Sequence, residues 1–131
     1  MRFSKKTDYA IILIDALQQG YFSDGFTSIT DIAKAHRISK LFLEKVAQEL
    51  RGEGVIQSRR GRAGGYRLIK NPSALTLFDV ISVFEKTDMM QRMKSLNPDT
   101  RCPAAKLVPL KKRWTDIEEK IKNIFQKTTF V

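Results

Sequence analysis

The sequence has 131 residues, 42% hydrophobic and 29% charged, with no apolar run of the ~20 residues that span a bilayer and no signal peptide. These proportions fit one folded domain with an extension, which we expect in the cytoplasm and not on a membrane. The net charge of +10 favours a polyanionic partner, nucleic acid above all, while a single Cys102 and a single His36 exclude a disulfide framework and a thiolate zinc site.

The first predicted element is an amphipathic helix over about residues 4–18. Its apolar residues follow the spacing i, i+3, i+4, i+7 and are Ala10, Leu13, Ile14 and Leu17. Residues 20–27 then contain an Asp-Gly pair and predict a loop.

Two short helices follow the loop. Ser28 and Asp31 form a capping-box-like start to a helix that ends near Ala35. Ser39 caps a second, longer helix that the glycines at 52 and 54 end. The expected buried face of this second helix consists of Leu43, Val46, Ala47 and Leu50. Two short helices joined by a tight turn are typical of a helix-turn-helix, with His36 at the turn and without a chemical role.

The next segment predicts a β-hairpin with a basic tip. Residues 55–59 and 66–70 are strand-like, and residues 60–65 between them are rich in glycine and arginine. The segment lacks the Gly-Lys-Ser/Thr ending of a nucleotide-binding loop. Its arginines suit entry into a narrow minor groove, so we interpret the hairpin as the wing of a winged helix.

The C-terminal third predicts two more helices. Thr76 and Asp79 repeat the capping signature before an apolar face made of Leu77, Val80, Ile81 and Phe84. After a polar stretch at 89–101, a long helix is secure from about Pro109. Its apolar residues are spaced 4, 3, 4, 3 and form a heptad seam of Leu110, Trp114, Ile117, Ile121 and Ile124. We interpret the seam as a dimer interface, the alternative being a helix packed on its own domain.

The sequence thus predicts a mainly α fold with a small β-hairpin. A winged helix-turn-helix domain over residues 1–86 precedes a linker, or sensor-remnant loop, at 87–102, and residues 103–131 form the dimerisation helix and tail. A helix of about 10–12 Å diameter fits the major groove, where Glu44 could accept a hydrogen bond from a cytosine amino group. The candidate DNA-binding residues are Ser39, Lys40, Leu41, Glu44, Lys45, Gln48, Arg59, Arg60, Arg62 and Arg67. A winged helix that contacts another protein is the alternative.

Several segments together resemble the Rrf-2 family of BadM-type winged-helix regulators. They are MRFS at residues 1–4, DYA at 8–10, IS at 38–39, LE at 43–44 and RGRAGGYRL at 60–68. The resemblance covers nearly the whole chain, and the arginine–glycine wing followed by an aromatic residue is its most specific part. It implies a homodimer that binds a pseudo-palindromic operator, with Glu44 and Arg60 at the positions of the family's recognition-helix glutamate and wing arginine.

The sensor region departs from this family. Cluster-bearing members are expected to have three cysteines at roughly six-residue intervals before the long helix, of which Cys102 matches only the middle one. Leu96 and Val108 occupy the other two positions and cannot bind iron, and Lys111 replaces a histidine ligand used in one branch. We therefore expect no iron–sulfur cluster, no other metal and no cofactor.

Two residues that match sensor positions of the family, Asp8 and Cys102, each have two interpretations. Asp8 matches a carboxylate that the partner subunit supplies in another branch, but an acid in the first turn of a helix is the simpler interpretation. Arg101 and Lys106 favour a thiolate at Cys102, which makes this residue the candidate for a redox-responsive switch. The alternative for Cys102 is a leftover thiol.

These observations predict a sequence-specific DNA-binding transcription regulator, a repressor, that binds double-stranded DNA as a homodimer. The alternatives are a redox- or metal-responsive switch acting through Cys102 and a winged-helix protein-interaction module. An enzyme is not expected because no catalytic pair is visible. The signal would come from a small-molecule effector or a regulatory partner protein.

Overall fold

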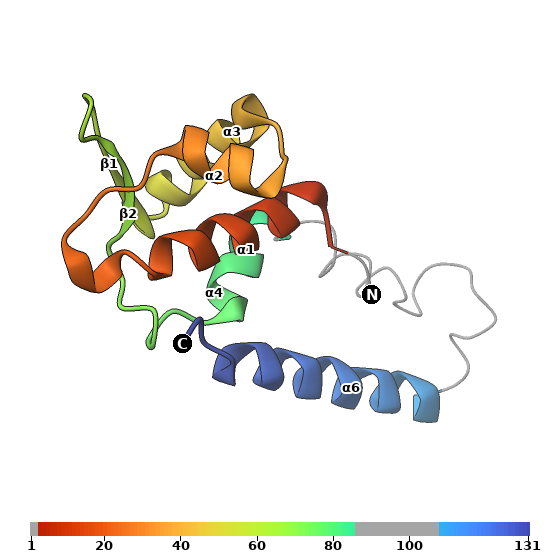
Figure 1. Ribbon diagram of the computed structural model, residues 1–131. Coiled ribbons are helices and arrows are strands. Elements are labelled where there is room, and N and C mark those ends of the chain that lie inside the picture. Colours follow the sequence, from red (N-terminus) through yellow and green to blue (C-terminus); the bar gives the residue numbers. More distant parts are fainter. Residues whose placement is uncertain (1–2, 86–107) are drawn as a thin grey trace.

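The computed structural model describes residues 3–85 and 108–131. The elements are α1 (Lys5–Gln18), a short 3₁₀ helix η1 (Tyr21–Ser23), α2 (Ile29–His36), α3 (Lys40–Gly52), β1 (Ile56–Arg59), β2 (Gly65–Leu68), α4 (Leu77–Phe84) and α6 (Val108–Lys127). Figure 1 shows α2 and α3 on one side of α1, α4 and α6 on the other, and the hairpin beyond the C-terminal end of α1. The predicted mainly helical fold with one hairpin is confirmed.

Helix α1 lies at the centre of this arrangement. Its start is capped by Ser4, whose side chain accepts a hydrogen bond from the Thr7 backbone N–H at 3.3 Å. All four apolar residues predicted for its inner face are buried. Helix α1 therefore packs against α3, α4 and β2 at the same time.

The predicted helix-turn-helix is present as α2 and α3. The Ser39 hydroxyl accepts from the Phe42 N–H at 3.3 Å, as expected of a cap. Ser28 is also an N-cap, but its side chain makes no capping hydrogen bond, so the expected capping box is absent there. The preceding Thr27 is paired with Tyr66 of β2, and this pairing fixes the chain at the start of α2 instead. Helix α2 extends one residue further than predicted, to His36.

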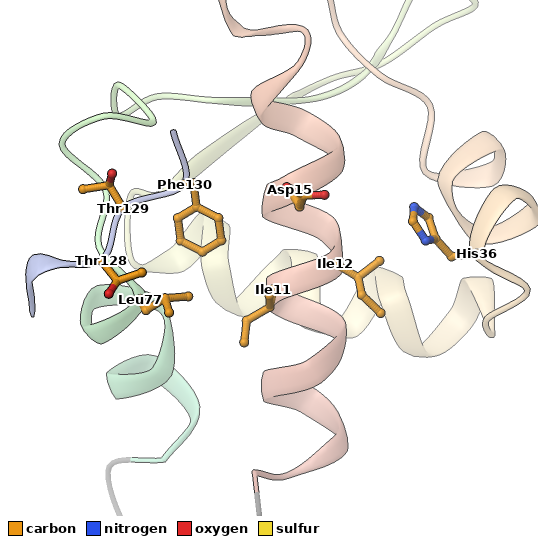
Figure 2. Close-up of a pocket in the computed structure, with 8 residues that line it drawn as sticks. All are labelled: Ile11, Ile12, Asp15, His36, Leu77, Thr128, Thr129 and Phe130. Carbon is orange, nitrogen blue, oxygen red and sulfur yellow. The ribbon is translucent and has the colours of Figure 1, made fainter. Parts of the chain in front are cut away.

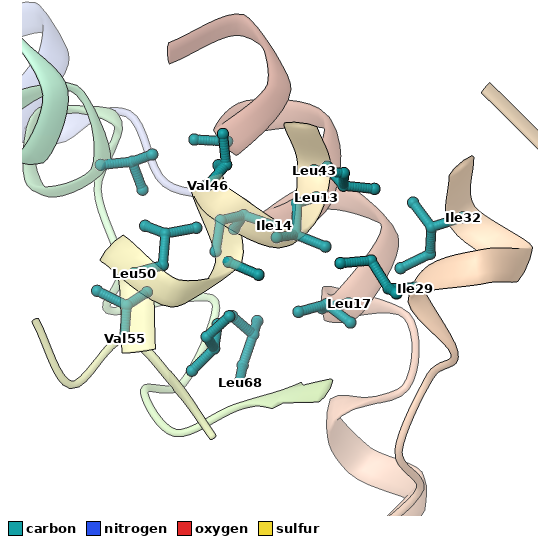
Figure 3. Packing of buried hydrophobic residues seen from close by; sticks show 14 of the residues in the cluster. Leu13, Ile14, Leu17, Ile29, Ile32, Leu43, Val46, Leu50, Val55 and Leu68 are labelled. Atoms are coloured by element: carbon teal, nitrogen blue, oxygen red, sulfur yellow. The ribbon is translucent and has the colours of Figure 1, made fainter. Parts of the chain in front are cut away.

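The hydrophobic core is built mainly from α1, α2 and α3. Figure 3 shows Leu13, Ile14 and Leu17 of α1 lying between side chains of α2, α3 and the hairpin. The four residues predicted for the inner face of α3 are all fully buried. Burying one such leucine or isoleucine stabilises the fold by about 1.5–3 kcal/mol, so this core fixes how the second helix of the motif is presented.

The hairpin is joined to the rest of the domain through the edge of β2 that does not pair with β1. Strands β1 and β2 pair antiparallel, with Ile56 opposite Leu68 and both residues fully buried. On the other side of β2, the Thr27 N–H donates to the Tyr66 carbonyl at 2.8 Å, and the Tyr66 N–H donates back at 2.9 Å. Gly65 has φ of +141°, and a Cβ there would collide with the Thr27 backbone. Only glycine therefore lets the loop before α2 approach β2 this closely.

Helix α4 begins with the predicted capping box. The Asp79 N–H donates to the Thr76 hydroxyl at 3.1 Å, and the Thr76 N–H donates to the Asp79 carboxylate at 3.0 Å. Thr76 also pairs with Thr129 of the C-terminal tail, and the Leu77 N–H donates to the Thr128 carbonyl at 2.8 Å. The tail after α6 is therefore bonded to the start of α4.

A buried carboxylate joins the end of α4 to the start of α1. One oxygen of Glu85 accepts from the Ser4 N–H at 2.8 Å and from the Thr7 hydroxyl at 2.7 Å. Glu85 is only 5% exposed. A charged acceptor at the first turn of a helix is favourable because unpaired N–H groups gather there.

The predicted division at residues 86/87 and 102/103 stays a prediction, since residues 86–107 lie outside the described part of the chain. Within residues 3–85 and 108–131, no helix combines the length and apolar character that crossing a membrane requires.

The close approach at Gly65 can be tested by substitution. We expect Gly65→Ala to lower the free energy of unfolding by about 1–3 kcal/mol, because its backbone conformation is strained for alanine and its Cβ meets Thr27. Gly52→Ala is the matched control: this glycine ends α3 with open space around it, and alanine there should be neutral or stabilising by up to about 1 kcal/mol. Urea denaturation measures both, and equal stabilities would contradict the role of Gly65.

Candidate nucleic-acid interface

Helix α3 presents a solvent-exposed face opposite its buried one. Leu41, Lys45 and Gln48 follow the spacing i, i+4, i+7 and are all exposed. Glu44 lies on the same face, and its carboxylate is 3.9 Å from the Lys40 ammonium. Ser39, the remaining predicted contact on this helix, uses its hydroxyl as the N-cap. The structure therefore places the five predicted residues of α3, and its cap Ser39, outside the buried stripe of this helix.

The four arginines of the wing are of two kinds. Arg59 and Arg67, the first kind, have partners within the chain. The Arg59 guanidinium donates to the Ala63 carbonyl at 3.1 Å, and its Cζ lies 4.3 Å from the centroid of the Phe26 ring. Arg67 forms an ion pair with Asp24 at 3.1 Å and lies 5.7 Å from the same ring. Cation–π contacts of this kind contribute about 0.5–1 kcal/mol at exposed sites. Both arginines thus brace the wing against the loop before α2.

Arg60 and Arg62 form the second kind. Both lie at the exposed turn between β1 and β2. Within the described part of the chain, neither has a hydrogen bond, ion pair or ring contact. Their charges are therefore available to an anionic partner, which suits arginines at the tip of a DNA-binding wing.

The sequence did not reveal the residues that support the wing. Asp24, Phe26 and Thr27 lie in a segment that its composition marks only as a loop. Asp24 has a left-handed backbone conformation with φ of 55°, and its carboxylate points to Arg67. The Asp24-Gly25 pair gave a signal for the turn, but no local pattern indicated a partner some forty residues away.

Helix α6 has two different apolar faces. Ile121 and Phe125 are half-buried, and the Phe125 ring lies 5.9 Å from that of Phe3. Ile117 and Ile124, by contrast, are 44% and 61% exposed. The helix therefore packs on α4 of its own domain and still presents part of the predicted seam to solvent. The side chains of Leu110 and Trp114, the other two seam residues, lie outside the described residues.

Most of the sensor residues that the sequence singles out lie outside the described part of the chain. Leu96 and Cys102 lie outside the described residues, as do the side chains of Val108 and Lys111. Asp8 is exposed on the first turn of α1. Across residues 3–85 and 108–131, no three histidine, cysteine, aspartate or glutamate side chains lie together.

A hollow of about 320 Å³ lies on the side of α1 between α2 and the C-terminal tail. Figure 2 shows its lining residues, which are Ile11, Ile12, Asp15, His36, Leu77, Thr128, Thr129 and Phe130. His36 and Ile12 lie at one end, and Phe130 and the threonines lie at the other. Because its polar groups do not converge on one point, we assign this hollow no ligand.

The fold and the arrangement of recognition helix and wing agree with one family model. The Rrf2 model, described as "Iron-dependent Transcriptional regulator", matches residues 3–131. The chain belongs to the Rrf2 family. This family consists of transcriptional regulators and not of enzymes, and the chain is a DNA-binding regulator of the helix-turn-helix type.

Two relatives and one solved structure illustrate what this chain is similar to. The transcriptional regulator CymR of Bacillus subtilis is 28% identical over 98% of this chain and 86% of its own. Its solved structure has a TM-score of 0.72 and covers 99% of this chain and 93% of that one. The regulator IscR of Yersinia pseudotuberculosis is 29% identical over 98% of this chain and 76% of its own. A solved structure from Listeria innocua, 24% identical over 99% of this chain and 83% of its own, has the same fold with a TM-score of 0.83.

The description of the family as iron-dependent raises the question of whether these residues fit an iron centre. The whole sequence contains one cysteine and one histidine. A cluster held by three or four thiolates cannot form on one subunit with one thiol. The donor set of this chain therefore does not fit the thiolate-ligated iron–sulfur centre.

The two kinds of wing arginine should behave differently on substitution. Arg67→Ala should lower the free energy of unfolding by about 1 kcal/mol, because it removes the contacts with Asp24 and Phe26. Arg60→Ala should stay within about 0.5 kcal/mol of wild type and yet weaken binding to duplex DNA. Urea denaturation and fluorescence anisotropy measure the two effects. Equal destabilisation by both substitutions would show that the division is wrong.

Proposed function

We propose that this regulator binds a pseudo-palindromic operator as a homodimer, with α3 in the major groove and the wing in the adjacent minor groove. The observation that carries the proposal is the exposure of Arg60 and Arg62 at the turn of the wing, together with the exposed face of α3. Lysines and arginines supply most of the affinity by neutralising phosphates, whereas groups on α3 distinguish bases. We also propose repression as its mode, since a dimer bound across a promoter would block polymerase.

The exposed part of α6 supports the homodimer. Ile117 and Ile124 are seven residues apart and therefore lie on the same face of the helix. Leaving such side chains in water forgoes about 25 cal/mol for each Å² of apolar surface that a partner would cover. A second copy of the same helix offers the matching stripe, and two recognition helices cover a longer operator than one.

We further propose that the regulator acts without an iron–sulfur cluster or other cofactor. The supporting observation is the donor set, in which Cys102 is the sole thiol of each subunit. The redox role of Cys102 and control by an effector or a partner protein stay predictions, because this residue lies outside the described structure.

A charge on the exposed face of α6 should separate the subunits. Ile124→Glu and Ile117→Glu would each place an unpaired carboxylate in the proposed interface, at a cost of several kcal/mol, roughly, on association. We expect light scattering to show monomers and operator binding to weaken. Asn123→Glu adds the same charge at an exposed position outside the seam and should leave the dimer intact. A wild-type protein that is monomeric at micromolar concentration would refute the homodimer.

DNA selection from a random pool tests the main proposal and the absence of a cluster together. Protein purified without oxygen should be colourless and should select two inverted half-sites with centres about 10 base pairs, or a multiple, apart. The logarithm of affinity should fall linearly with the logarithm of salt concentration. Failure to enrich any sequence would contradict a sequence-specific regulator, and an iron-dependent brown chromophore would contradict the cluster-free proposal.

A further inference from the structure

The exposed face of α3 contains one large apolar side chain that the fold does not use. Leu41 is 67% exposed, whereas Phe42 next to it packs on the core and meets the Tyr9 ring edge-on at 4.9 Å. Its neighbours on the same face, Lys40 and Lys45, are basic and exposed. Glu44, also on this face, has its carboxylate 3.9 Å from the Lys40 ammonium. An isobutyl group among these charged side chains is poorly suited to an apolar protein surface but well suited to a groove of DNA.

The position of Leu41 within the helix restricts what it can touch. It is the second residue of α3, and the first turn of a recognition helix is the part that reaches base edges in the major groove. The base edges there present donors and acceptors, with one exception, the C5-methyl group of thymine. A leucine cannot donate or accept a hydrogen bond, so the methyl group is the one feature of a base edge that it can distinguish.

We propose that Leu41 is a specificity-determining residue that recognises the methyl group of a thymine in each operator half-site. This inference rests on the proposed function, because it needs α3 in the major groove. Leu41 and Glu44 are three residues apart, which places their Cβ atoms about 5–6 Å apart. Base pairs are about 3.4 Å apart along the DNA axis. The thymine therefore lies one or two steps from the base pair that Glu44 contacts.

The test removes the methyl group from the DNA and the isobutyl group from the protein separately. The thymines of the selected operator are replaced by deoxyuridine one position at a time, in both half-sites together. Fluorescence anisotropy then measures the affinity of the wild type and of Leu41→Ala for each operator. A buried methyl contributes about 0.8 kcal/mol, or about four-fold in affinity, so two half-sites give about fifteen-fold. At one thymine position we expect this loss for the wild type and almost none for Leu41→Ala.

Two controls keep the result specific. We expect Lys45 on a phosphate, and a phosphate contact does not distinguish bases, so Lys45→Ala should lower the affinity for all sequences and keep the deoxyuridine profile of the wild type. Where cytosine replaces the same thymine, 5-methylcytosine should restore part of the wild-type affinity, since it returns the methyl group alone. Circular dichroism confirms that Leu41→Ala, a change at an exposed position, is folded.

The possible results separate this inference from the main proposal. Identical deoxyuridine profiles for wild type and Leu41→Ala, with the operator still bound, would overturn the role of Leu41 alone. If Leu41→Ala lost affinity equally for all sequences, this result would also overturn the role of Leu41, because it would place the side chain against the sugar–phosphate backbone. A wild-type protein that binds no operator would remove the proposed function itself.

Discussion

Burial of one face of α1 is the constraint on which the rest of the structure depends. Leu13, Ile14 and Leu17 are in contact with the core on the side of α3 and the hairpin, and the same helix packs on α4. Because protein interiors are packed as densely as organic crystals, α3 cannot shift relative to α1 without opening a void. Helix α3 and the base of the wing therefore share one rigid support, and their packing on α1 fixes the distance between them.

The local elements could be predicted because each has a local cause. The spacing of Leu43, Val46, Ala47 and Leu50 predicts which face of α3 is buried. The capping pair Thr76 and Asp79 predicts the start of α4. The contacts that hold the wing against the loop before α2 have no such local cause. Arg59 and Arg67 look alike in the sequence, and only the tertiary contacts with Asp24 and Phe26 distinguish them from Arg60 and Arg62.

Helix α6 shows that the spacing of apolar residues can be identified correctly and still not reveal what their face of the helix contacts. A heptad seam and the inner face of a packed helix differ by only about 20° for every seven residues. In this chain the two faces lie side by side, so that Ile121 is half-buried while Ile117 and Ile124 are exposed. Packing on its own domain therefore accounts for Ile121, while the dimer interface stays a prediction for Ile117 and Ile124, and no spacing rule could have assigned the individual residues.

The bonds between the C-terminal tail and the start of α4 fix one end of α6. The helix has 20 residues and is therefore about 30 Å long. Its C-terminal end is held where Thr128 and Thr129 meet Thr76 and Leu77. A turn of about 10° around that fixed end would displace the other end by about 5 Å, by simple trigonometry on this length. Conversely, a movement of a few ångströms at the far end would correspond to only a small rotation at the capping box of α4.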